Sequence, residues 1–188
     1  MEIRQLWRVF LVERALARDY QTPYQLSSMI PAARNPILES LLPSLLHVKL
    51  ASILDAALEE YLDTNEHTLP KGYRNDLNGR ICYCSDSGLI DNGDDLHEVR
   101  GLRNDIGHEP DAGASWDDLD RDVCRVHHTL HHLGFVGPLQ NFRVHGERSA
   151  MVKADEPGVL GRQTYTIRVM DGDKRAAEWS WTNTLYDD

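Results

Sequence analysis

The chain has 188 residues, a net charge of −10, 41% hydrophobic residues and 27% charged residues, which suits one soluble domain or one domain with an appendage. This acidity argues against broad, sequence-independent binding of nucleic acid, although it leaves room for a small basic cleft. Three cysteines do not make a disulfide framework, and no run approaches 18 uninterrupted apolar residues. We therefore expect reduced thiols, no membrane span and a cytoplasmic location.

Apolar residues at three- and four-residue steps predict two helices, over residues 2–20 and about 36–62. The second is apolar on almost all sides, which is typical of a helix in the middle of a bundle. Pro43 predicts a kink in it or the start of a second segment. We interpret His47 and Lys49 as lying at its solvent-exposed edge. The intervening segment, residues 24–34, is predicted to be irregular with at most one short helical turn.

Three further helices are predicted, over residues 73–84, 96–108 and 116–133. Asp94 or Asp95 can cap the middle one. Pro110 disfavours helical backbone at the preceding residue, so this helix should end near His108.

The last of these helices is the clearest amphipathic helix in the sequence. Ser115 followed by Asp118 predicts a capping box at its start.

The pattern changes to period two from about Asn141 onward. Asp171-Gly172-Asp173 predicts a hairpin turn, and Phe142 and Val144 should open a third strand. The alternation also predicts that Trp179 and Trp181 face a core. The sequence therefore predicts a mainly α fold: a four- to five-helix bundle in residues 1–136, with a small C-terminal antiparallel β-meander in residues 137–188.

One stretch combines residues that suit phosphate chemistry. In the helix predicted to end at His108, the side chains of Arg100, Asn104 and His108 follow one another at i, i+4 spacing, with Arg103 beside them. Arginine offers a fixed fork of donors that matches phosphate oxygens, and histidine serves as acid or base at neutral pH. Gly107 removes a side chain that would crowd the space between the cation of Arg103 and the imidazole.

The stretch Arg103-Asn104-Asp105-Ile106-Gly107-His108 resembles the signature of the HEPN family, in which an arginine and a polar residue precede a histidine by this spacing. The resemblance covers roughly residues 1–136. It implies a metal-independent endoribonuclease, without a cofactor, that leaves a 2′,3′-cyclic phosphate at a composite site in a homodimer. Arg103 and His108 would then be catalytic and Asn104 would help to orient them. Arg100 is our addition, as a possible contact to substrate phosphate.

The resemblance also implies roles for the protein as a toxin or defence effector, with a nucleotidyltransferase-like antitoxin or another regulatory protein as a possible partner. A structural interpretation remains open, in which Arg103 pairs with Asp105 or Glu98 and His108 caps backbone carbonyls. The acidic residues around the motif favour a further alternative, a non-catalytic helical module for dimerisation, nucleotide binding or protein binding.

A second cluster lies in the last helix and comprises Cys124, His127, His128, His131 and His132. Imidazoles at i, i+4 can bind zinc or nickel. No fourth ligand is evident, so we interpret the cluster as an exposed, non-functional histidine face and assign no metal site.

Overall fold

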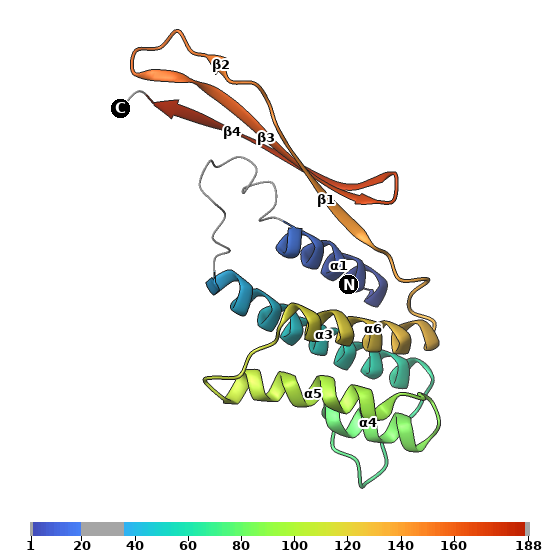
Figure 1. Ribbon diagram of the computed structural model, residues 1–188. Helices are drawn as coiled ribbons and strands as arrows, with labels where there is room; N and C mark the ends of the chain where they lie inside the picture. The colour runs from blue at the N-terminus through green and yellow to red at the C-terminus, as the bar shows by residue number, and fades with distance from the viewer. Residues whose placement is uncertain (1, 20–35, 187–188) are drawn as a thin grey trace. The chain divides into compact units, whose positions relative to one another are not determined.

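The computed structural model describes residues 2–19 and 36–186, which contain five helices and a four-stranded antiparallel sheet (Figure 1). The described residues divide into two compact units: residues 2–10 with 36–139, and residues 11–19 with 140–186. The predicted helices and sheet are present, but the proportions were wrong. The sheet is too extensive for a small appendage, and the chain is mixed α+β. The irregular segment predicted at residues 24–34 lies outside the described residues.

The helices are α1 (Ile3–Asp19), α3 (Pro36–Thr64), α4 (Leu77–Asp86), α5 (Gly93–His108) and α6 (Trp116–His132). Helix α4 begins later than predicted because Asp76 is its N-cap, where its Oδ1 accepts a hydrogen bond of 2.9 Å from the Gly79 amide. Helix α5 begins earlier than predicted. Its N-cap is Asn92, and Asp94 and Asp95 lie in its first turn, so neither is the cap.

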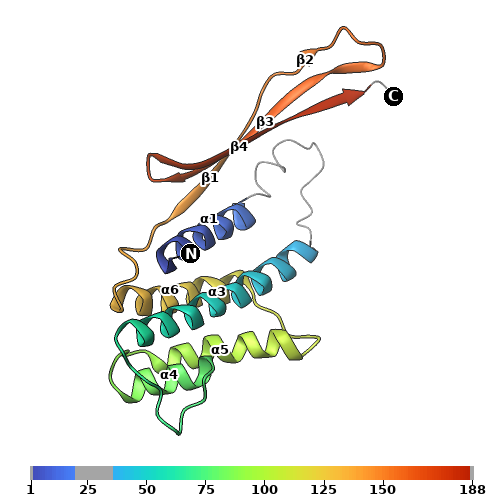
Figure 2. The ribbon, with the colours of Figure 1, turned by 180° about the vertical axis from the view of Figure 1, so that it is seen from behind.

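Helix α3 is the central helix of the first unit and contacts α4, α5 and α6 (Figures 1 and 2). It continues through Pro43, which lies near its start. Leu50, Leu54 and Leu58 are fully buried. The Leu41–Thr64 part of α3 is long and apolar enough to cross a membrane. Half of its most apolar stretch is buried inside the protein, however, and the core helix of a soluble protein can have the same length and composition.

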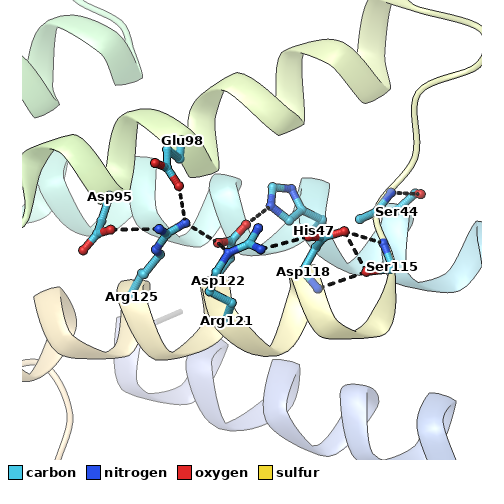
Figure 3. A network of polar contacts seen from close by, with 10 residues as sticks. Ser44, His47, Asp95, Glu98, Ser115, Asp118, Arg121, Asp122 and Arg125 are labelled. Atoms are coloured by element: carbon cyan, nitrogen blue, oxygen red, sulfur yellow. Dashed lines mark hydrogen bonds and ion pairs between the residues drawn. The ribbon is translucent and has the colours of Figure 1, made fainter.

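His47 of α3 is fully buried, so its predicted place at the solvent-exposed edge was wrong. Its Nε2 lies 2.8 Å from Oδ2 of Asp122 in α6, whose side chain is also buried (Figure 3). A buried polar group is tolerated where it has a partner, and Asp122 supplies one that lies 75 residues further along the chain.

Arg125 of α6 extends this network to α5 (Figure 3). Its guanidinium lies 3.0 Å from Asp122, 2.9 Å from Asp95 and 2.7 Å from Glu98. Three carboxylates therefore share one arginine, and the contact ties the first half of α5 to α6.

The first half of α1 belongs to the same unit. Trp7 is buried, and its ring stacks on His127 of α6 with centroids 5.9 Å apart. Arg4 Nε donates a hydrogen bond of 3.3 Å to the carbonyl of Phe135. Burial, with the nearby His131 and His128, lowers the pKa of His127, which favours the neutral imidazole in this stack.

The second unit contains the sheet, made of β1 (Phe142–Arg148), β2 (Val152–Lys153), β3 (Val159–Asp171) and β4 (Lys174–Tyr186). Strand β3 is central: β4 pairs with one of its edges, and β1 and β2 pair one after the other with the opposite edge. The predicted turn is confirmed, because Asp171 pairs with Lys174 and Gly172 has a φ of 59°.

The two faces of the sheet differ. One face carries a polar ladder, in which Thr164 bonds Thr182, Thr166 bonds Ser180, and Arg168 bridges Glu147 and Glu178.

The other face carries Tyr165, Ile167, Val169, Trp179 and Trp181. Ile167 and Val169 are buried, but Trp179 is 47% exposed and Trp181 39% exposed. Their predicted place in a core was therefore wrong. Both tryptophans lie on β4, which pairs only with β3 among the described residues, so each ring has a neighbouring strand on one side alone. Trp181 stacks on Tyr165 with ring centroids 5.5 Å apart.

Candidate functional site

Helix α5 places the four residues of the predicted site in two different surroundings. Arg100, Arg103 and Asn104 line a pocket of about 230 Å³. His108 is exposed at the last position of the helix and is not part of the pocket lining. The structure therefore brings three of the four residues together and leaves the imidazole open to solvent.

The pocket lies between α3, α4 and α5. Its remaining lining comes from the middle of α3 and the first turn of α4, and comprises Ala51, Ser52, Asp55, Asp76, Leu77 and Asn78. The sequence analysis identified the α5 residues but missed this wall. The only local signal for it was the capping pattern of Asp76 ahead of α4, and the α3 residues are distant in sequence.

The two carboxylates in the lining already have partners. Asp55 pairs with the buried guanidinium of Arg80, which also binds Glu59. Asp76 accepts the Gly79 amide through one oxygen, and its other oxygen lies 3.4 Å from Arg74. The acidic groups therefore do not pair with the arginines of α5 in this structure.

Arg100 is the more enclosed of the two arginines in the pocket. Its Nε is shielded from solvent and has no hydrogen-bond partner among the described residues. A buried donor without a partner costs about 1–3 kcal/mol. Arg103 is exposed, and its Nη1 donates a hydrogen bond of 3.1 Å to Oδ1 of Asn104.

Three of the four acidic residues of α5 (Asp94, Asp95 and Glu98) lie in the first half of the helix, and Asp105 lies within the motif. Asp95 and Glu98 bind Arg125 of α6, so Glu98 has a partner other than Arg103. The contact between Arg103 and Asn104 also differs from the pairing with Asp105 or Glu98 that the structural interpretation required.

The end of α5 matches the sequence prediction. Glu109 is the C-cap, has extended backbone, and donates its amide to the Asp105 carbonyl at 2.8 Å. A Cβ added at Gly107 would meet nothing within 4 Å. No contact among the described residues therefore explains the glycine, and in this part of the chain nothing covers the position of the missing side chain.

The histidine-rich face of α6 forms no metal-binding group. Among the described residues, no set of three or more histidine, cysteine or acidic side chains is placed to hold a metal ion. His128 bonds Asp91 at 2.8 Å, and this hydrogen bond lowers the pKa of Asp91. His127 stacks on Trp7 as described above.

Comparison of the chain with protein-family models, with curated proteins and with solved structures found no match.

Proposed function

We propose that the protein is a metal-independent endoribonuclease of the HEPN type, with Arg103 and His108 as catalytic residues and Asn104 as the residue that orients Arg103. The observation that carries this proposal is the exposure of Arg103 and His108 in the last turns of α5. There Arg103 bonds Asn104, and His108 is exposed one helical turn further on. The open space at Gly107 supports it, because a glycine costs about 1 kcal/mol of helix propensity and this one serves no contact within the chain.

The reaction requires two proton transfers. A base takes the proton of a ribose 2′-hydroxyl, the 2′-oxygen attacks the adjacent phosphorus, and an acid gives a proton to the departing 5′-oxygen. The product is a 2′,3′-cyclic phosphate and a free 5′-hydroxyl. One chain supplies one His108, so the proposal includes a homodimer in which one imidazole acts as base and its mate as acid. Arg103 binds the phosphate oxygens as charge develops on them.

The test is cleavage of total RNA by the purified protein in excess EDTA, followed by analysis of the product ends. We expect cleavage with cyclic phosphate termini, and a loss of at least 100-fold in rate for His108→Ala and for Arg103→Ala. His145→Ala and Arg8→Ala are matched controls, because both side chains are exposed and neither residue belongs to α5. Inhibition by EDTA, or equal cleavage by His108→Ala, would overturn the mechanism, and a monomeric active species would overturn the two-histidine scheme.

In a cell, this activity would suit a cytoplasmic toxin or defence effector that is held in check by an antitoxin or another regulatory protein. Expression in a bacterium tests this role. Growth should stop with the wild-type chain and continue with Arg103→Ala or His108→Ala.

The alternative is a non-catalytic helical module that dimerises or binds a nucleotide or a protein. The exposed Trp179 and Trp181 favour it, because exposed aromatic side chains are common in binding surfaces. Normal growth on expression, together with no cleavage by the purified protein, would select this alternative.

A further inference from the structure

We propose that the pocket between α3, α4 and α5 is a phosphate-binding subsite, which holds a phosphate of the substrate strand next to the one that is cleaved. The identity of the ligand as RNA rests on the proposed function. The preference for a phosphate group rests on the pocket itself, whose lining includes Arg100 and Arg103.

Arg100 is the central group of this subsite. Its Nε is enclosed and lacks a partner among the described residues, although its guanidinium lines the cavity. A buried donor of a charged group normally binds an acceptor. The arginine fork matches phosphate geometry, so a phosphate in the cavity is suited to this guanidinium, and a small shift of the side chain would let Nε donate as well.

The opposite wall offers further donors. Leu77 and Asn78 open α4, which has ten residues. Amides in the first turn of a helix have no acceptor within the helix, and the Asp76 side chain accepts only that of Gly79. The positive end of the α4 dipole therefore adds to the charge of the two arginines. Ser52 also lines the α3 wall, but its hydroxyl donates to the Val48 carbonyl at 2.9 Å.

The two carboxylates of the lining repel a bound phosphate less than two unpaired carboxylates would, because both have partners. Asp55 is held by Arg80, and Asp76 by the Gly79 amide and Arg74. Two arginines of the lining, Arg100 and Arg103, have no carboxylate partner among the contacts described.

The size of the pocket limits what it can hold. Its volume of about 230 Å³ is below the roughly 300–1,000 Å³ of pockets that enclose drug-sized ligands. It suits one phosphate group with part of its sugar rather than a whole nucleotide. Since His108 is not in the lining, the pocket has no imidazole to move protons. It is suited to bind and position the strand while Arg103, which lies at its border, also reaches the scissile group.

The first test uses inorganic phosphate as the probe and needs no cleavage. We expect saturable changes in the NMR amide signals of Leu77 and Asn78, and at least tenfold weaker binding in Arg100→Gln, since a charge-assisted hydrogen bond contributes about 1.5–3 kcal/mol. Arg8→Gln, at an exposed position of α1, is the matched control and should bind as the wild type does.

Ser52→Asp, at an exposed position in the α3 wall, should also weaken binding and avoids any folding defect of the Arg100 variant. Unchanged binding in both pocket variants, or no change at the α4 amides, would overturn the subsite.

The second test distinguishes RNA from free phosphate as the ligand. On a short RNA, Arg100→Gln should raise KM at least tenfold and leave kcat within about twofold. Replacing the neighbouring phosphate by a neutral methylphosphonate should abolish the difference between the variant and the wild type. A fall in kcat without a change in KM would place Arg100 in the chemical step and overturn the assignment. Phosphate binding without any cleavage would refute the ribonuclease proposal alone, and cleavage without phosphate binding would refute the subsite alone.

Discussion

Among single residues, Asp122 has the largest number of charged partners in the core. Burial opposes its ionisation, but hydrogen bonds from His47 and Arg125 outweigh burial and lower the pKa of this carboxyl. A carboxyl with a lowered pKa in the folded state stabilises the protein above its unfolded-state pKa of about 3.9. This contribution is lost as the pH falls through the folded-state pKa.

We predict that Asp122→Asn lowers the free energy of unfolding by about 3 kcal/mol at pH 7, because it leaves the buried His47 without its charged partner and removes one of the three carboxylates that bind Arg125. The difference from the wild type should begin to shrink below pH 4, because the carboxyl of the unfolded chain becomes protonated there while the folded-state carboxyl, whose pKa is lower, is still ionised. Urea unfolding followed by circular dichroism at pH 7 and pH 3 measures both values. Asp117→Asn, at an exposed position in the same helix, is the control and should change stability by less than about 0.5 kcal/mol. A difference that is equal at both pH values would contradict this account of Asp122.

At the scale of elements, two of the three glycines of α5, Gly101 and Gly107, allow effects on stability and on function to be told apart. A Cβ added at Gly101 or at Gly107 meets nothing within 4 Å. Each alanine substitution should therefore raise the free energy of unfolding by up to about 1 kcal/mol through helix propensity.

Only Gly107 lies between Arg103 and His108 in the sequence. We predict that Gly107→Ala lowers RNA cleavage at least tenfold and that Gly101→Ala leaves it unchanged, as thermal unfolding and cleavage assays on the same samples would measure. Equal activity in the two variants would show that the missing side chain at Gly107 does not contribute to the site.

The same helix illustrates what a sequence can predict at this scale. Its end at His108 follows from Pro110, and the capping box of α6 follows from Ser115 and Asp118; both are present. These features depend on neighbours within a few residues. The α3 and α4 walls of the pocket, and the partner of His47, depend on residues that are 25–75 positions away. No local pattern encodes such contacts, so the sequence yielded the motif but not the pocket that it lines.

At the scale of the molecule, the two units place tryptophans in opposite surroundings. Trp7 is 3% exposed in the helical unit, where Trp116 is partly exposed, and Trp179 and Trp181 are exposed on the sheet. We predict that acrylamide quenches a large part of the native fluorescence, and that the triple variant Trp116→Phe/Trp179→Phe/Trp181→Phe, which keeps Trp7 alone, retains a weakly quenched emission at shorter wavelength. Trp7→Phe is the opposite control and should keep the part of the fluorescence that acrylamide quenches strongly. Weak quenching in the wild type would show that another surface covers the two sheet tryptophans.

The alternation of residues predicted the strands and their hairpin, but not whether the aromatic face is covered. Period two identifies which side chains share a face. It carries no information on what lies against that face, and the exposed Trp179 and Trp181 are the result. The size of the sheet was underestimated for a different reason, because β3 and β4 have 13 residues each and are longer than the alternating stretches that the sequence shows.

Strand β4 follows all the described helices in the sequence, and β3 pairs with it along most of its length. During synthesis, α6 has therefore emerged in full well before the sheet can be completed. Since domains that emerge first from the ribosome generally fold first, the helices that carry Arg103 and His108 would acquire their structure while the sheet is still being translated. A toxic activity of these helices would then need restraint on the nascent chain, before release of the finished protein.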